Sequence, residues 1–536
     1  MKKILDYLLL ALLLFFLRLP IMAQEETKTG PIEFPEFIIE GKERIDVPSG
    51  SKLYPNKPVP LTKNELDSLN PLRKQPTDLL PQKKFPRSLA SYNKKSGYVK
   101  GEFGMFVTPS LEASYSGNFD EYSFFGSGSF ESSNGDAKNS DYSKAGLRLI
   151  TDYLAPDKYL VFGGSNTKAK IIFDTKSYNL YGASDPAARN QSRLLLSVDS
   201  DGRYEGYGFS TGAGFRTLQI SDKLQGNKSN AFDNGFYGYL DVNKPFGSIL
   251  AGASAEINFG SIMGKGVLFA QANVNASFDF GKDLSVRAMA GLQASESQAG
   301  VTKGGLKAEG SLEYRFDHNF TFHAGILSGL EKNSYYDNAQ FNPYISTTSI
   351  VEFPYNVFLL KGFLYYHPNE VLSLSGGIKF GVMDDTPVFV SLDSAVFRTS
   401  YQSVTQASII FEGMFEATTI DNIVCNIFIN FTNMADNNKS RPYQPKLRLS
   451  SSYKRQWFDS FGTIIGLDYV GERYADIDNK KSLDAYIDVK LKFNYNIFED
   501  LQGFLNIDNL LNSDVYIWDY YKERSIYISA GVFWKF

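Results

Sequence analysis

Three histidines are the first side chains to test for chemistry, because imidazole serves as a general base or a metal ligand near neutral pH. The chain contains only His318, His323 and His367. They do not cluster in sequence, and no serine-nucleophile elbow or metal-binding motif accompanies them. His323 is two residues from both Thr321 and Gly325, so in a strand all three lie on the same face. This indicates that His323 is a polar residue on an inner face. We therefore expect no enzyme and no catalytic, cofactor-binding or metal site.

Two further features of the sequence have reactive side chains. Cys425 is the only cysteine, so it forms no internal disulfide, and it alternates in phase with Ile423 and Ile427 on an apolar face. We interpret it as an inert, lipid-facing residue. Asp384 and Asp385 are adjacent carboxylates that we place in a short turn, where turn chemistry is favoured over a calcium site.

The composition favours strands over helices. Of 536 residues, 15% are aromatic and 45 are Gly. Aromatic residues are enriched in strands, and glycine is enriched in tight turns. The net charge of −4 is not the strongly basic charge that is typical of nucleic-acid-binding proteins. We therefore expect an all-β protein that binds no nucleic acid.

The N-terminal part divides into two segments. In residues 1–23, two lysines precede an apolar run that ends at Ala23, which is typical of a secretory signal peptide. Residues 24–97 hold ten of the 21 prolines, and within 50–97 ten Lys and Arg outnumber three acidic residues. Proline at this density breaks both helix and sheet. We predict a signal peptide followed by an extended, Pro-rich basic linker.

From residue 98 to 536, apolar and polar residues alternate with period two. In 306–316, even positions are Leu, Ala, Gly, Leu, Tyr and Phe, and odd positions are Lys, Glu, Ser, Glu and Arg. Short turns such as 316–319 alternate with long loops such as 332–343. This pattern predicts a transmembrane antiparallel β-barrel of about 22 strands, with 22 to 24 counted. A soluble sandwich would need a second sheet over every apolar face, whereas lipid covers those of a barrel.

The last strand is predicted to close this barrel. In ISAGVFWKF (528–536), the even positions are apolar and are expected to face lipid, with aromatic residues at the membrane interface. A terminal aromatic residue on such a strand resembles the assembly signal read by the outer-membrane insertion machinery. We assign that role to Trp534 and Phe536.

The last hundred residues resemble those of TonB-dependent receptors. The most specific element is Asn509-Leu510-Leu511-Asn512, followed by Tyr516. The resemblance implies a 22-stranded barrel, but the family's globular N-terminal plug has no counterpart in the Pro-rich residues 24–97. Energy-coupled import is therefore not carried over. The matching stretches are RPYQPKLRLSSSY (441–453), LDYVGERYAD (467–476), AYIDVKLKFNY (485–495), FLNIDNLLNSDVY (504–516) and the terminal strand.

One strand-prone patch, EFIIEG, lies in the linker. Full receptors pair a short extended segment near the mature N-terminus with TonB by strand addition. Phe37, Ile38 and Ile39, flanked by acidic residues, are similar in character. We name them as TonB-box-like partner-binding residues. The alternative is a structural strand or a contact inside the lumen.

The expected function follows from the barrel. We predict a receptor-like, porin-like transport protein that moves a solute across the outer membrane of a Gram-negative bacterium. The alternative is a non-transporting outer-membrane scaffold or subunit that docks periplasmic or surface partners. Expected partners are outer-membrane lipid, the barrel assembly machinery, and TonB or another periplasmic protein through residues 24–97.

The linker is also expected to occupy part of the lumen. Residues 50–97 carry a net charge of +7, whereas residues 98–536 carry −9. Tethering keeps the local concentration of the linker at the barrel mouth high, and charge attraction is stronger in a confined lumen than in bulk water. The alternative is that extracellular loops fold inward while the linker remains a periplasmic docking arm.

Overall fold

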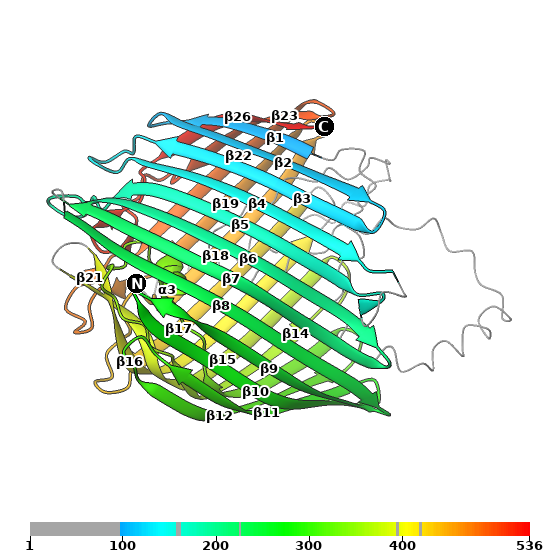
Figure 1. Cartoon of the computed structure of the whole chain (residues 1–536). Helices are drawn as coiled ribbons and strands as arrows, with labels where there is room; N and C mark the ends of the chain where they lie inside the picture. The colour runs from blue at the N-terminus through cyan, green and yellow to red at the C-terminus, as the bar shows by residue number, and fades with distance from the viewer. Residues whose placement is uncertain (1–96, 157–161, 225–226, 393–395, 417–420) are drawn as a thin grey trace, which may run out of the picture. The chain divides into compact units, whose positions relative to one another are not determined.

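The computed structural model describes residues 97–156, 162–224, 227–392, 396–416 and 421–536 (Figure 1). One antiparallel sheet of 22 strands closes on itself, because β1 pairs with both β2 and β26. The prediction of an all-β barrel is confirmed, and the strand count falls at the lower end of the expected range.

The strands of the sheet follow one another around the barrel: β1 (Gly97–Gly104), β2 (Thr108–Phe119), β3 (Tyr122–Ser133), β4 (Tyr142–Leu154), β5 (Asn166–Asn179), β6 (Ala188–Tyr204), β7 (Tyr207–Leu224), β8 (Asn227–Phe246), β9 (Ile249–Ile262), β10 (Lys265–Phe280), β11 (Leu284–Glu296), β12 (Thr302–Arg315), β13 (Phe320–Leu330), β14 (Tyr355–Tyr366), β15 (Leu372–Ser391), β16 (Phe397–Glu416), β17 (Asp421–Met434), β18 (Leu447–Phe458), β19 (Phe461–Val470), β22 (Tyr486–Phe498), β23 (Leu501–Asp508) and β26 (Tyr527–Lys535). Two small hairpins and a helix lie outside it: β20 (Arg473–Tyr474) with β21 (Ser482–Leu483), β24 (Tyr516–Trp518) with β25 (Tyr521–Lys522), and α3 (Tyr335–Phe341).

The seam is closed by the two ends of the described chain. The backbone N–H of Gly97 donates to the carbonyl of Phe536, and the N–H of Phe536 donates to the carbonyl of Gly97, both at 3.0 Å. Between these residues and Gly104, β1 and β26 pair residue by residue. Closure leaves no unpaired sheet edge, which satisfies the backbone without water. The predicted role of the last strand in closing the barrel is confirmed.

Apolar and polar side chains occupy opposite faces of the wall. On β12, Leu306 is 69% exposed on the outer face, and the Lys307 ammonium reaches 3.4 Å from Gln271 Oε1 on the inner face. On β26, Ile528 and Trp534 are exposed, whereas Ser529 is buried. The alternation predicted for 306–316 and 528–536 is therefore confirmed, with even positions outward in both.

The two ends of the barrel differ in their connections. The end that holds Gly97 and Phe536, here the turn end, has tight connections such as 205–206 and 247–248. The opposite end, here the loop end, carries most of the long connections, and α3 and β21 lie there, away from the C-terminus (Figure 1). Its long loops are 134–141, 180–187, 331–354, 435–446, 471–485 and 509–526.

Helix is scarce in the described ranges. There, α3 is the one α-helix and spans seven residues. No helix in this part of the chain is long and apolar enough to cross a membrane.

Candidate binding cavity at the loop end

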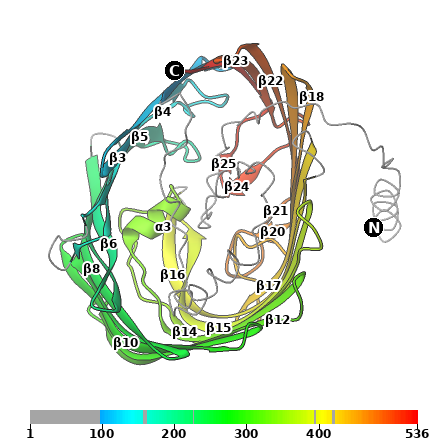
Figure 2. The same cartoon turned by 90° about the vertical axis from the view of Figure 1, so that its right-hand side faces the viewer.

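Two loops fold into the loop end of the barrel. Figure 2 shows α3, β24 and β25 inside the ring of strands. We call residues 331–354 and 509–526 together the cap. Part of the sequence-based alternative, that loops fold inward, is therefore correct. The predicted occupant of the lumen, residues 50–97, lies almost wholly outside the described residues.

The cap has an apolar core that it shares with the wall. Trp518 is central to it, with ring centroids at 4.6 Å from Tyr443, 5.2 Å from Phe397 and 5.5 Å from Phe389. Burial of aromatic and aliphatic surface on this scale favours one fixed loop arrangement. The buried members are Leu218, Ile220, Ala231, Ile262, Tyr335, Ala339, Ile345, Val351, Phe389, Phe397, Trp518 and Tyr521.

The start of α3 is fixed from two sides. Ser334 is its N-cap, and the Ser334 hydroxyl accepts a hydrogen bond from the Asp337 N–H at 3.0 Å. Asp233 on β8 accepts from the Tyr336 N–H at 2.7 Å. Both bonds satisfy backbone donors that the first turn of a helix leaves free. The wall thus contributes one of the caps of this inward-folded helix.

A buried arginine anchors the other end of this loop. The guanidinium of Arg189 on β6 is 0% exposed and donates to both carboxylate oxygens of Asp222 at 2.6 Å. Its third contact is the Pro343 carbonyl at 2.7 Å, which also accepts from the Tyr178 hydroxyl at 2.7 Å. A bidentate pair at this depth is stable only while both partners remain. We call Arg189, Asp222 and Pro343 the latch.

A second anchor lies at the beginning of the same loop. The side-chain amide of Gln293 on β11 accepts from the Leu330 N–H at 2.7 Å and donates to the Leu330 carbonyl at 3.0 Å. Its amide nitrogen also lies 3.1 Å from Gln271 Oε1. Gln293 thus replaces backbone partners where β13 leaves the sheet.

The asparagine-leucine element, residues 509–512, forms the turn in which the 509–526 loop of the cap leaves β23. Asn509 and Asn512 adopt positive φ values of 48° and 51°, a region that asparagine tolerates better than most residues. The Asn509 amide accepts from the Ser513 N–H at 2.8 Å and donates to the Arg524 carbonyl at 3.2 Å. Asn512 Oδ1 accepts from the Ile526 N–H at 3.0 Å. The element therefore fixes both limbs of the 509–526 loop.

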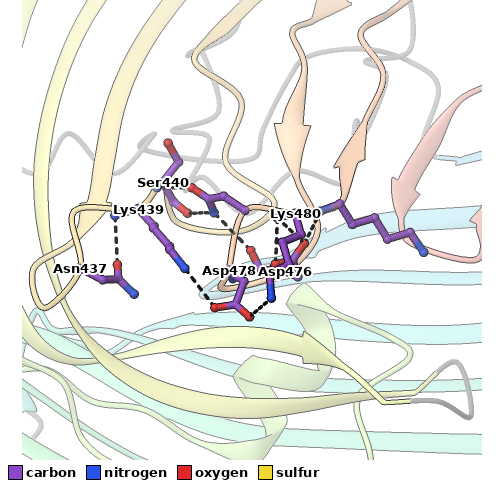
Figure 3. Close-up of polar contacts among 8 residues, drawn as sticks. Asn437, Lys439, Ser440, Asp476, Asp478 and Lys480 are labelled. Carbon is purple, nitrogen blue, oxygen red and sulfur yellow. Dashed lines mark hydrogen bonds and ion pairs between the residues drawn. The ribbon is translucent and has the colours of Figure 1, made fainter.

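Two neighbouring loops join beside the cap (Figure 3). The Lys439 ammonium contacts the Asp478 carboxylate at 3.0 Å, and the Ser440 N–H donates to Asn479 Oδ1 at 2.7 Å. The Asp476 carboxylate accepts from the N–H groups of Asp478 at 2.7 Å and Lys480 at 3.1 Å. These contacts are those of an aspartate-capped turn and indicate a structural role.

Between the cap and the wall of β4 and β5 lies a cavity of about 280 Å³. This volume is close to the lower limit of about 300 Å³ typical of small-molecule sites. Tyrosine rings and charged side chains of both signs line it. The tyrosines are Tyr142, Tyr178, Tyr181 and Tyr344, and the charged residues are Asp136, Asp141, Lys144, Lys176, Lys522, Glu523 and Arg524.

Glu523 stands out among the charged residues. It is exposed, and it forms no hydrogen bond or ion pair through its carboxylate with any residue that the structure describes. Partial desolvation in the cavity raises the pKa of Glu523 above its ordinary value, Arg524 opposes that shift, and Asp136 reinforces it. The site therefore holds a carboxylate whose charge is incompletely compensated by the protein.

Below the cap, the inner wall carries pairs of oppositely charged side chains. Lys168 pairs with Asp152 at 3.3 Å, and Arg193 pairs with Asp174 at 3.1 Å. These cross-strand pairs are partly exposed, so each contributes modestly to stability. Lys100 and Glu102, 2.8 Å apart on β1, complete a similar pair at the seam.

The histidines are not brought together. His323 faces inward 3.8 Å from the Glu313 carboxylate, whereas His318 and His367 lie in connections at the turn end. No group of three or more potential metal-ligating residues occurs in the described ranges. Cys425 on β17 shares its parity with the exposed Phe431, in agreement with an outward position.

The predicted turn at Asp384 and Asp385 is wrong. Both residues lie within β15, at a register shift between Met383 and Thr386, and Asp385 has φ of 51°. Asp384 accepts from the Ser403 hydroxyl at 2.7 Å, and Asp385 pairs with Lys303 at 2.7 Å. A bulge inserts an extra residue into a strand, and its turn-like sequence was indistinguishable from a true hairpin.

The assigned assembly and partner residues have different outcomes. Trp534 and Phe536 lie on the outer face at the turn end, 50% and 41% exposed, with ring centroids 5.2 Å apart. Their role in assembly stays a prediction. Phe37, Ile38 and Ile39 lie outside the described residues.

The sequence did not reveal Arg189, Asp222 or the pair Glu523 and Arg524 as site residues. One signal was available: loops that only cover a pore mouth do not need the aromatic content of YY (335–336) or WDYY (518–521). Aromatic residues in a long loop indicate packing.

No family model and no curated protein matches this sequence. Solved structures do match. The FrpB iron transporter from Neisseria meningitidis shares 10% identity at a TM-score of 0.66, over 83% of this chain and 82% of that one. The ferric-catecholate import receptor Fiu from E. coli K12 shares 9% at 0.63, over 83% and 82%. The copper transporter OprC shares 10% at 0.63, over 82% and 80%.

Identity this low establishes the fold alone. The structure, with its 22-stranded closed sheet, aligns over most of both chains. The chain therefore has the barrel fold of the TonB-dependent receptors.

Proposed function

We propose that this protein is a receptor-type transport barrel that binds a small polar solute in the loop-end cavity and releases it into the lumen when the cap moves. The cavity carries the proposal, because it lies between the cap and the wall and is lined by tyrosine rings and by charged side chains of both signs. Sites of this kind, concave and lined by aromatic rings with a few polar groups, are the usual form of small-molecule sites.

Two further observations support transport. The inner wall below the cap carries ion pairs, as expected of a wet passage. Proteins with the same fold include an iron transporter, a ferric-catecholate import receptor and a copper transporter.

The outward apolar face and the fold support a location in the outer membrane of a Gram-negative bacterium. Under this proposal, residues 1–23 direct export, and the barrel assembly machinery inserts the barrel into outer-membrane lipid. Residues 24–97 then face the periplasm, where Phe37, Ile38 and Ile39 pair with TonB or another partner by strand addition.

A scaffold that does not transport is the second candidate. The packed core of the cap and the buried latch favour it, because they hold the cap inside the loop end by contacts within the protein. The two candidates differ in whether loosening the cap opens a passage.

Solute flux into proteoliposomes separates them. Purified chain and an Arg189→Ala variant would be tested by swelling with glycine, arabinose and sucrose. We expect slow flux of small solutes through the unchanged barrel and faster flux through the variant, because loss of Arg189 removes one of the two hydrogen bonds to the Pro343 carbonyl and leaves Asp222 without its partner. Absence of flux in both proteins would contradict transport and favour the scaffold.

A further inference from the structure

Two lysines face each other directly on the inner wall of the barrel. Lys361 on β14 and Lys379 on β15 are partners in the strand register. Their neighbours Leu360 and Phe380 are exposed on the outer face, so both lysine side chains project into the lumen. Neither lysine forms a hydrogen bond or an ion pair with any residue that the structure describes. Like charges directly opposite each other destabilise a sheet, so this pair is unfavourable unless an anion lies near it.

Like charges that face each other elsewhere on the inner wall have a counter-ion in the protein. Asp468 lies opposite Asp488, and the Lys490 ammonium lies 3.4 and 3.2 Å from their carboxylates. Lys144 lies opposite Lys176, and Lys144 forms an ion pair with a glutamate of β3 at 3.2 Å. The pair on β14 and β15 therefore departs from the way in which this wall compensates its charges.

A third cation lies on the same row of the wall. In the strand register, this row runs from Lys361 through Gly325 on β13 and Ser311 on β12 to Arg287 on β11. Arg287 is exposed, and it also forms no hydrogen bond or ion pair within the described ranges. We call Arg287, Lys361 and Lys379 the cationic row.

The glycine in this row lets one lysine reach toward the arginine. A methyl group at Gly325 would come within 2.9 Å of the Lys361 Cε atom, so the stem of this lysine lies over β13. The next position of the row is Ser311, whose small side chain is partly exposed. Lys361 and Arg287 thus flank a small position that carries a hydroxyl group, and a solute in the lumen can reach both.

Two carboxylates of β12 lie beside the cationic row but do not neutralise it. Glu309 and Glu313 are each two residues from Ser311, and no ion pair joins either of them to the cationic row in the described part of the chain. The Glu313 carboxylate lies 3.6 Å from the Arg315 guanidinium and 3.8 Å from the His323 ring. Three cations with one neighbouring glutamate that lacks another cationic contact leave this part of the lumen positively charged.

We propose that the cationic row binds the transported solute on its way through the lumen, and that this solute is a small anion with two or more carboxylate or phosphate charges. This inference rests on the proposed function and names the class of solute. Such a solute accepts charge-assisted hydrogen bonds from the ammonium and guanidinium groups, and the attraction is stronger in a confined lumen than in bulk water. A neutral sugar gains no such bonds, and a cation is repelled.

Calorimetric titration of the full chain in phosphatidylcholine nanodiscs tests the assignment. The probes are succinate, inorganic phosphate and succinamide, which keeps the succinate skeleton without its charges. We expect at least one anion to bind, and succinamide to bind about tenfold or more weakly than the tighter anion, because it lacks the charge-assisted hydrogen bonds. Tighter binding of succinate assigns carboxylates to the site, and tighter binding of phosphate assigns phosphate groups. No binding of either anion at millimolar concentration, or succinamide binding as tight as that of the anions, overturns the proposal.

Matched double variants locate the site. Lys361→Gln with Lys379→Gln should weaken the anion about tenfold or more. Lys168→Gln with Lys170→Gln removes the same charge from the lumen, but both of these lysines already pair with aspartates, at 3.3 and 3.8 Å, so affinity should change less than about twofold. Heat-modifiable migration confirms that both variants are folded. Equal loss in the two variants, or none in the first, overturns the assignment. Solute flux in the Arg189→Ala barrel without anion binding would refute this inference alone, whereas absence of flux would refute the proposed function.

Discussion

The loop end and the turn end of the barrel are built from the same strands but differ in their connections and in the side chains of their inner walls. At the turn end, short connections close hairpins, and the inner wall carries cross-strand ion pairs. At the loop end, the part of the inner wall on β7, β8, β9, β15 and β16 is apolar and packs against the cap. The comparison teaches that an inner face has no fixed polarity: it is polar where water fills the lumen and apolar where the chain itself does.

Strand β7 shows the change along one row of side chains. Its inward positions run from Gly212 and Arg216 near the middle to Leu218 and Ile220, both 0% exposed, at the loop end. The intervening outward positions at that end are Thr217, Gln219 and Ser221. The alternation is therefore inverted, with apolar residues inside and polar residues outside. Such an inversion is expected where a strand leaves the bilayer and meets an inward-folded loop.

The largest expected effect tests the latch against an ordinary wall pair. Arg189→Ala should destabilise the packing of 331–354 by about 3–5 kcal/mol, because Asp222 would keep a buried charge without its partner. Hydrogen exchange of 335–344, measured by mass spectrometry, should become faster.

Arg193→Ala is the matched control. Arg193 lies on the same strand and also pairs with an aspartate, but both side chains are partly exposed, so the expected cost is below about 1 kcal/mol. Similar exchange in the two variants would show that the latch does not hold the cap.

Much of the barrel followed from the sequence because its determinants are local. Period-two alternation in 306–316 and the apolar even positions of 528–536 gave the faces directly. The cap did not follow: Arg189 and Asp222 are opposite each other in the β6–β7 hairpin, but Pro343 is 154 residues from Arg189 in sequence and reaches it only in the folded barrel. The bulge at Asp385 was missed for a similar reason. The ion pair that Asp385 forms with Lys303 joins residues that are far apart in sequence.

The next largest effect contrasts the two faces of one strand. Leu312→Arg places a charge on the lipid face of β12 and should cost about 2–4 kcal/mol near the midplane, whereas Ser311→Arg projects into the lumen and should be nearly neutral. Urea unfolding in lipid vesicles measures both. Equal tolerance would mean that the outer face at this depth does not contact lipid.

A smaller effect is expected at the seam of the turn end. Deleting Phe536 removes its two backbone hydrogen bonds to Gly97, worth about 1–3 kcal/mol together, as well as the terminal aromatic ring. The yield of heat-modifiable barrel in membranes should fall. Phe536→Ala keeps the backbone pair, so a loss there as well would assign the effect to the ring and to assembly. An undiminished yield after deletion would exclude the assembly role.

The smallest expected effect concerns the basic linker. Because the cap already folds into the loop end, deleting residues 50–90 should leave the conductance of the otherwise unchanged barrel in planar bilayers the same. In an Arg189→Ala background the cap is loosened, and the same deletion should raise conductance if the positive linker occupies the negatively charged barrel. A large steady pore after the single deletion would instead make the linker, rather than the cap, the seal. No change in either background would leave the linker as a periplasmic docking arm, and the cap would then account for closure by itself.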